Sequence, residues 1–240
     1  VSEVFVKANI KGGKLFWEGY SDALITKGLL AFLITNPILS QEINISDKND
    51  NKQGNWKKYF KNGNIKYEGQ FKDNYPVGIF KFYYETSELK SEKEFFHKGK
   101  AAATRFYNKD GKIISIGLYV DEVKDSTWVY FNSDSIVILS EEYKNGKLNG
   151  STKTYYDNGK LYEHKIWNEG VQDGLMKQYY LDGSVKFEAN FNLGIKNGTQ
   201  KSYFQNGKIY SEGSYKNGEK EGLWKFFNIS GDIDTTYYIE

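Results

Sequence analysis

Apolar and polar residues alternate along short segments of the chain. Residues 65–72 read IKYEGQFK, which places Ile65, Tyr67, Gly69 and Phe71 on one face of an extended strand and charged or amide side chains on the other. Residues 185–192, VKFEANFN, repeat this arrangement. A period of two with one polar face predicts a half-buried antiparallel strand and not a helix.

Turn dipeptides separate these segments. An aromatic pair such as Tyr59-Phe60 precedes each dipeptide, and an alternating segment follows it. Because Asn-Gly and Asp-Gly tolerate positive φ at both central positions, they predict tight turns, and each unit is therefore a β-hairpin. The dipeptides are Asn62-Gly63, Asn158-Gly159, Asp182-Gly183, Asn206-Gly207 and Ser230-Gly231.

The hairpins recur at a fixed period. Successive starts lie 24, 23, 25, 24, 24, 24 and 24 residues apart, at Gly54, Gly78, Ala101, Ser126, Gly150, Gly174, Gly198 and Gly222. One hairpin cannot bury its own apolar face, so neighbouring units must stack. The sequence predicts an all-β fold: an elongated single-layer antiparallel sheet of about eight tandem hairpins of ~24 residues.

Two units depart from the pattern. Residues 112–120 are apolar on both faces, and Glu163-His164-Lys165 stands where other units have a Glu-Gly step. These are the places where the array is expected to bend or to be covered.

Composition removes several function classes. The 240 residues contain no Cys and two His, which excludes disulfides, thiolate metal sites and cysteine nucleophiles. Acidic residues (31) nearly equal Lys and Arg (33), so the formal charge of +2 argues against a nucleic-acid partner. Aromatic residues make up 17% of the chain and suit a thin architecture better than a thick core.

The units fit the pattern G-x-W-K-x-Y-Y-x-N-G-x-[LI]-x-x-E-G-x-[YF]-K-N-G, best at residues 198–218 and 54–72. This pattern resembles the MORN repeat, specifically the bacterial variant found in YwqK-family antitoxins of toxin–antitoxin systems. The resemblance covers residues 54–240. It implies a single-layer sheet of hairpins without enzyme activity. MORN repeats elsewhere take part in protein contacts, and lipid contacts have been proposed for them, although nothing else in this sequence supports a lipid partner.

The first 53 residues divide into three parts. Residues 1–23 form a leader in which Lys14–Tyr20 resembles half a unit. Residues 24–41 contain Lys27 followed by an uncharged run from Gly28 to Gln41, which is too short to span a bilayer and is typical of a secretory signal. The alternative is a short apolar helix that caps the first strand edge. Residues 42–53 are predicted to be a polar linker.

No constellation of residues indicates catalysis, a cofactor or a metal ion. His97 and His164 lie in different units without a neighbouring ligand residue, and both are expected at the surface or an edge. The Asp47–Asn51 run fails the calcium-loop pattern because Lys52 and Lys58 replace the required Gly and Glu. Carboxylates such as Glu68, Glu188 and Glu212 recur at one repeat position opposite lysines, which predicts a ladder of cross-strand pairs.

The predicted function is a non-catalytic interaction or scaffold module that binds a protein along its aromatic-rich sheet. The candidate contact residues are Trp56, Trp128, Trp224, Tyr155, Tyr179 and Tyr203, with core filling as the alternative role for the three tryptophans. Two settings compete. The signal-like segment favours an exported module that binds an envelope or surface protein. The family resemblance favours a cytoplasmic antitoxin that neutralises a cognate toxin by direct binding.

Overall fold

The computed structural model describes residues 7–11, 14–18 and 42–239. Every regular element in this part of the chain is a β-strand. The chain divides into two compact units, one comprising Val1–Gly111 and Leu118–Glu122 and the other Lys112–Gly117 and Val123–Glu240. The segment 24–41, predicted to be a signal or a cap, lies outside the described residues.

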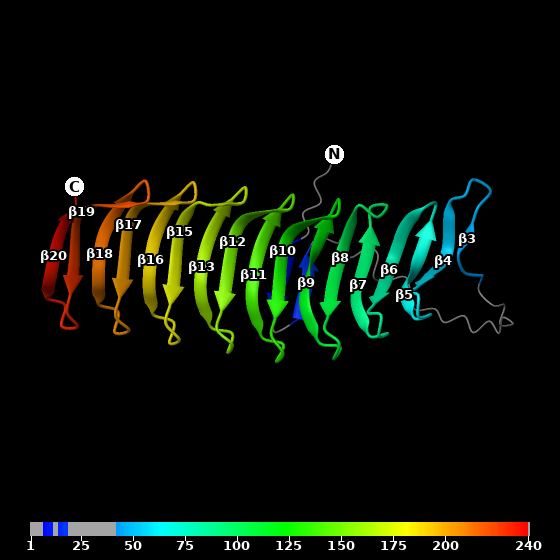
Figure 1. Cartoon of the computed structure of the whole chain (residues 1–240), viewed down its shortest axis with the longest axis horizontal. Helices are drawn as coiled ribbons and strands as arrows, with labels where there is room; N and C mark the ends of the chain where they lie inside the picture. Colours follow the sequence, from blue (N-terminus) through cyan, green and yellow to red (C-terminus); the bar gives the residue numbers. More distant parts are fainter. Residues whose placement is uncertain (1–6, 12–13, 19–41, 240) are drawn as a thin grey trace. The chain divides into compact units, whose positions relative to one another are not determined.

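Successive strands of the first unit pair antiparallel with the next in the chain (Figure 1). They are β3 (Ile45–Ser46), β4 (Lys52–Tyr59), β5 (Ile65–Lys72), β6 (Tyr75–Tyr83), β7 (Leu89–Phe96) and β8 (Ala101–Tyr107). β1 (Lys7–Lys11) and β2 (Lys14–Glu18) pair with each other, and β9 (Ile113–Val120) contributes residues to both units. β3 lies within residues 42–53, predicted to be a linker, and pairs Ile45 with Gln53 of β4.

The second unit follows the same rule from β10 to β20 (Figure 1). β15 pairs with both β13 and β16. The strands are β10 (Val123–Phe131), β11 (Val137–Lys144), β12 (Lys147–Tyr155), β13 (Leu161–Asn168), β14 (Val171–Gln172), β15 (Gly174–Tyr179), β16 (Val185–Asn192), β17 (Ile195–Tyr203), β18 (Ile209–Lys216), β19 (Glu219–Phe227) and β20 (Ile233–Ile239). The all-β class and the tandem antiparallel hairpins are therefore confirmed.

The turn inside each hairpin differs from the predicted one. At Asn62-Gly63 only Gly63 has a positive φ, of 87°. The amide of Gly63 donates to Phe60 O, and the amide of Phe60 donates to Asn64 O. Because the Asn62 side chain accepts the amide of Asn64, the loop is a three-residue turn ending in a left-handed glycine. Positive φ at both central residues occurs instead in the turns that join hairpins, as at Asn145-Gly146.

A β-bulge explains the glycine that begins most units. Gly198, for example, has a φ of 97°, and the register of β16 against β17 shifts between Ala189 and Phe191. The pairing of β7 with β8 has no such shift. The start of the third unit is thus Ala102, one full period after Gly78, and the predicted start at Ala101 was wrong by one position. The longer turn His97–Lys100 takes up the residues that the bulge would have used.

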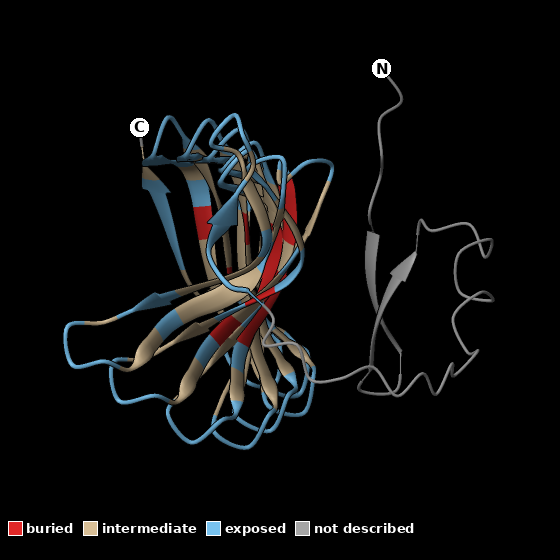
Figure 2. Ribbon diagram, turned by 90° about the vertical axis from the view of Figure 1, so that its right-hand side faces the viewer, coloured by how far each residue is buried: buried red, intermediate tan, exposed pale blue. Residues whose placement is uncertain are grey.

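Rings and glycines interlock on one side of the sheet in each unit, here called the aromatic face and defined by Trp56 and Phe80 in the first unit and by Trp128 and Trp224 in the second. Phe80, Trp128 and Trp224 are buried, and Figure 2 shows that buried positions lie within the strands whereas the turns are exposed. A Cβ added at Gly69, Gly117 or Gly213 would overlap the ring of Phe80, Trp128 or Trp224, respectively. Each of these glycines precedes its ring by the same interval in the sequence, so a glycine on one strand makes room for the aromatic residue of the next hairpin.

Candidate functional site: the ladder face

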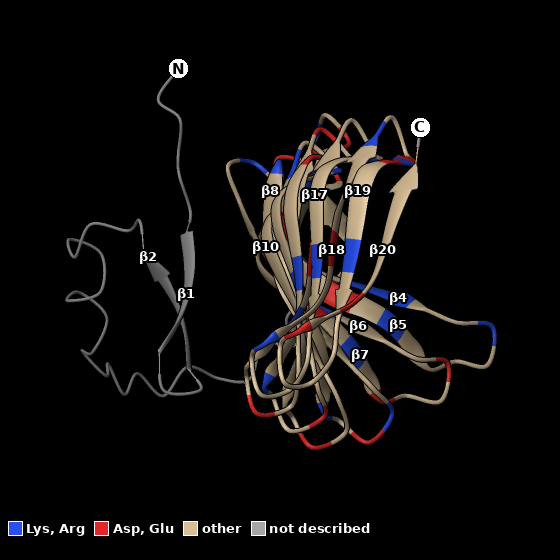
Figure 3. Ribbon diagram, turned by 90° about the vertical axis from the view of Figure 1, so that its left-hand side faces the viewer, with Lys and Arg blue, Asp and Glu red and all other residues tan. Residues whose placement is uncertain are grey.

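In each unit the side of the sheet opposite the aromatic face carries a row of charges at mid-strand. We call this side the ladder face. Figure 3 colours the Lys and Arg positions blue and the Asp and Glu positions red along the strands. The row is formed by directly opposed residues on successive strands. It comprises Lys57, Glu68, Lys81, Glu92 and Arg105 in the first unit, and Lys153, His164, Lys177, Glu188, Lys201, Glu212 and Lys225 in the second.

Ion pairs connect many of these rungs. The Lys57 ammonium lies 3.1 Å from Glu68, and Lys177 lies 3.3 Å from Glu188. Glu212 is shared between Lys201 at 3.9 Å and Lys225 at 3.6 Å. The side chains remain about one-quarter to one-third exposed, so each pair contributes at most about 1 kcal/mol. The predicted ladder of cross-strand pairs is therefore present.

Tyrosines of the aromatic pairs join neighbouring hairpins in several units, and Tyr83-Tyr84 does so in both directions. The hydroxyl of the first residue donates back to the carboxylate of an earlier strand, as from Tyr83 to Glu68 at 2.6 Å and from Tyr203 to Glu188 at 2.6 Å. The hydroxyl of the second residue donates forward to a backbone carbonyl, as from Tyr180 to Tyr203 O at 2.7 Å. A buried hydroxyl needs such a partner, which gives the tyrosine pair a structural reason in these units.

These hydrogen bonds alter the acidity of both partners. The hydrogen bond from Tyr83 and then that from Lys57 hold the pKa of Glu68 below its ordinary value of 4.5. Burial, together with the bond to Glu68, raises the pKa of Tyr83 to about 12. A lowered carboxyl pKa adds stability above the unfolded-state value, and this is lost as the pH falls through the folded-state value.

Replacing Tyr83 with phenylalanine is therefore expected to lower the free energy of unfolding by about 1 kcal/mol at pH 7. At pH 3 the loss should be smaller, because Glu68 is then largely protonated in the unfolded state and its lowered pKa contributes less. Urea unfolding of both proteins at the two pH values measures the difference. Tyr59→Phe, at the same repeat position but exposed, serves as control. An equal loss at both pH values would contradict the assignment.

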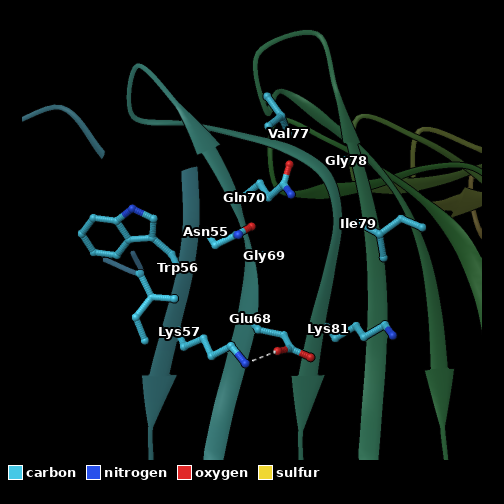
Figure 4. A pocket seen from close by; sticks show the side chains of 11 residues that line it. Asn55, Trp56, Lys57, Glu68, Gly69, Gln70, Val77, Gly78, Ile79 and Lys81 are labelled. Carbon is cyan, nitrogen blue, oxygen red and sulfur yellow. Dashed lines mark ion pairs between the residues drawn. The ribbon is translucent and has the colours of Figure 1, made fainter. Parts of the chain in front are cut away.

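A hollow lies beside the ladder in each unit. In the first unit it has a volume of about 670 Å³, and Lys57, Glu68 and Lys81 lie in a row along it (Figure 4). In the second unit a hollow of about 220 Å³ is lined by Lys201, Glu212 and Lys225. Each lining residue of the smaller hollow occupies the same repeat position as a residue that lines the larger one.

Exposed aliphatic side chains flank the charged row. Ile79, Leu175 and Leu223 occupy one repeat position, and their exposed fractions are 52%, 37% and 50%. By strand alternation this position lies on the ladder face, two residues before Lys81, Lys177 and Lys225. Polar or small residues occupy this position in the other units, so the three aliphatic side chains are separate exposed contacts beside the charged row.

The ladder is apolar at the start of the second unit and basic at its middle. Ile116 and Val129 take the charged positions and are buried. His164 replaces the usual glutamate between Lys153 and Lys177, and its Nε2 lies 3.0 Å from Ser151 Oγ. Burial, then the charge of Lys153, lowers the pKa of His164. The expected surface position holds for His97, which is exposed in a turn, whereas His164 is half-buried.

The predicted contact residues separate into two groups. Trp128 and Trp224 are 1% and 2% exposed. Both therefore fill the core, which was the alternative to a contact role. Trp56 is half-buried on the aromatic face, where Lys52 lies 4.9 Å from its ring centroid. The predicted tyrosines are half-buried on the ladder face: Tyr155, Tyr179 and Tyr203.

These exposed aliphatic residues were missed in the sequence. Their only signal was Ile79, Leu175 and Leu223 recurring among polar residues one position after a start glycine. The rejected calcium loop is a turn in which the Asp47 carboxylate accepts the amides of Asn49 and Asn51.

The fold and this face define a β-hairpin repeat array. Five segments match the model described as the MORN repeat variant, at residues 52–73, 76–97, 148–168, 172–193 and 196–217. Over these five segments the chain is therefore similar to MORN repeat variants. The unmatched stretch 98–147 includes the bulge-free pairing and the apolar part of the ladder.

Among solved structures the chain is similar to a mutant of S. aureus TarM in complex with Fondaparinux, alpha-GlcNAc-glycerol and UDP (18% identity, 45% of this chain, 19% of that chain, TM-score 0.24). It is also similar to TcdB2-TccC3-Cdc42 (13% identity, 75% of this chain, 12% of that chain, TM-score 0.20). The chain thus spans less than a fifth of either structure, and both likenesses are too distant to bear on function. No curated protein matches. The described residues include no helix long and apolar enough to cross a membrane.

Proposed function

We propose that this chain is a non-catalytic interaction module that binds a protein partner on the ladder face of β15–β19. The observation that carries the proposal is the exposure of Leu175 and Leu223 beside the charged row Lys177–Glu188–Lys201–Glu212–Lys225. Thr199 occupies the same repeat position between the two leucines, so the face presents two separate apolar contacts among charged and aromatic side chains, a mixture found in protein interfaces. The interaction role of MORN repeats elsewhere agrees with it.

The aromatic face is the less suitable surface. Its rings pack against glycines of the neighbouring strands, and lysines such as Lys196 and Lys220 lie over them, at 4.8 Å from Tyr215 and 4.4 Å from Trp224. The glutamates and lysines that could serve a hydrolase as acid or base groups are paired with one another on the ladder face, and they recur from unit to unit. A catalytic group is normally singular, which supports a binding function over an enzymatic one.

The identity of the partner depends on the compartment. We propose export, with an envelope or surface protein as partner, from the signal-like residues 24–41. In the alternative setting the protein is a cytoplasmic antitoxin and the partner is its toxin. N-terminal mapping of the mature protein after cell fractionation separates the two. A start near Gln41 in the envelope fraction supports export, and an intact cytosolic chain supports the antitoxin alternative.

Photo-crosslinking in the native cell tests the binding face. A photoreactive residue replaces Leu223, and in a matched control it replaces Leu181, which is 52% exposed but lies in a turn. The proposal predicts that one discrete protein crosslinks to position 223 and not to position 181. Leu175→Glu, four strands from the probe on the same face, should weaken that crosslink because the partner is proposed to span β15–β19, while leaving the thermal midpoint within a few degrees. Equal crosslinking from both positions, or none from position 223, would contradict the proposal.

A further inference from the structure

A second hollow in the first unit lies apart from the ladder. It has a volume of about 570 Å³ and is lined by Pro76, Lys93, Phe95, Tyr119, the turn Lys98–Lys100 and Glu122. This volume lies in the range of small-molecule sites. All its lining residues belong to the first unit.

Two departures from the repeat pattern place basic groups at this hollow. Thr104 stands at the repeat position that carries a ring in four other units, and Lys93 stands at the position that carries a facing glycine in three. The pairing of β7 with β8 also lacks the bulge, so the longer turn brings Lys98 and Lys100 to the rim. Gly99 holds this turn against Pro76, because a Cβ there would lie 2.7 Å from the proline ring.

Charge is unbalanced around the hollow. Three lysines line it, Lys93, Lys98 and Lys100, against the single acidic residue Glu122, and the Lys98 ammonium lies 5.5 Å from the centroid of the Tyr75 ring. Among the described residues none of the three lysines forms an ion pair within 4.0 Å. The Lys93 ammonium lies 4.7 Å from the centroid of the Tyr119 ring, so a cation and an aromatic wall meet at one place.

We propose that this hollow binds a small soluble molecule with a dianionic group of the phosphate-monoester type and a planar or apolar part. The dianion would lie among Lys93, Lys98 and Lys100, since three cations match a double negative charge better than a single carboxylate. The apolar part would lie against Phe95 and Tyr119.

The state of Lys93 agrees with an anion site. Burial lowers the pKa of its ammonium, and the negative charge of Glu122 offsets this lowering only in part. An anion bound beside Lys93 would compensate the buried charge and raise that pKa again. Lys196 provides a matched comparison, because it too is half-buried over a tyrosine ring and burial lowers its pKa, but it donates to Gln200 at 2.8 Å.

Titration of the full chain with phenyl phosphate tests the proposal, with chemical shifts of labelled lysine side chains as the readout. We expect saturable binding that is tighter than that of inorganic phosphate, and no binding of phenol. Lys93→Met and the double variant Lys98→Gln/Lys100→Gln should each weaken binding about tenfold or more. Lys196→Met should leave it unchanged.

Three outcomes would overturn the proposal. The first is absence of saturable binding of phenyl phosphate by the folded wild-type chain. The second is an equal loss of affinity in Lys196→Met, which would indicate unspecific charge attraction. The third is binding to phosphatidylglycerol vesicles without binding of phenyl phosphate, which would assign the lysines to a lipid surface. None of these results would alter the crosslinking expected at Leu223, which lies in the other unit.

Discussion

Replacing Gly213 with alanine is expected to lower the free energy of unfolding by about 2–3 kcal/mol. The added Cβ would overlap the indole of Trp224, which is 2% exposed. The edge of Tyr215 holds the indole, with ring centroids 5.4 Å apart. Gly213 does not adopt a left-handed backbone conformation, so the loss would report the steric conflict. Urea unfolding of the purified variant measures it, with Ser214→Ala as a control expected to differ from wild type by less than about 0.5 kcal/mol.

The double variant Gly213→Ala/Trp224→Thr shows whether the two residues act as a pair. Trp224→Thr alone should cost about 3–5 kcal/mol, because it empties a core position. Adding Gly213→Ala to it should then cost less than about 0.5 kcal/mol, since Thr104 stands at the ring position in the unit where Lys93 replaces the glycine. Strict additivity of the two single losses would contradict the interlocking of glycine and ring.

Replacing Lys165 with methionine is expected to destabilise the second unit by about 3 kcal/mol at pH 7. Lys165 Nζ lies 2.5 Å from the carboxylate of Glu163, whose side chain is only 12% exposed. Gln178 donates to the other carboxylate oxygen at 2.8 Å. Removing the cation would leave a buried charge with one neutral donor. Thermal and urea unfolding both measure the loss.

The pair itself should contribute little net stability. Glu163→Leu/Lys165→Met is expected to recover most of the loss, to within about 1 kcal/mol of wild type, because an apolar pair of similar volume avoids the desolvation penalty of two ions. Lys177→Met, which removes a cation from an exposed pair on the ladder face, is the control and should cost at most about 1 kcal/mol. A double variant less stable than Lys165→Met would contradict this explanation.

The period of 24 and the strand alternation were sufficient to predict the hairpin array and its charged ladder, because both depend on spacing alone. The turn geometry could not be predicted in this way, since Asn62-Gly63 is compatible with two turn types and only the hydrogen bonds distinguish them. The bulge was also missed. A glycine at the start of a unit indicates a special backbone position, but not which pairing shifts.

The two faces were harder to predict than the strands. Whether Trp128 and Trp224 lie in a core or at a surface does not follow from the sequence, because stacking of one hairpin on the next decides their burial. The exposure of Leu175 and Leu223 depends on the same stacking. The complementary pattern of Gly213 with Trp224 is visible in the sequence only when the glycine position of one strand is compared with the ring position of the next.

The affinity of the crosslinked partner for two purified variants tests the central claim most directly. Leu175→Glu/Leu223→Glu changes the ladder face, whereas Leu181→Glu/Leu193→Glu changes aliphatic side chains that are equally or more exposed but lie in turns. The proposal predicts that the first variant loses at least ~100-fold in affinity, or roughly 2.7 kcal/mol, and that the second binds as the wild type does. Equal affinities, or a loss confined to the turn variant, would contradict the ladder face as the binding surface.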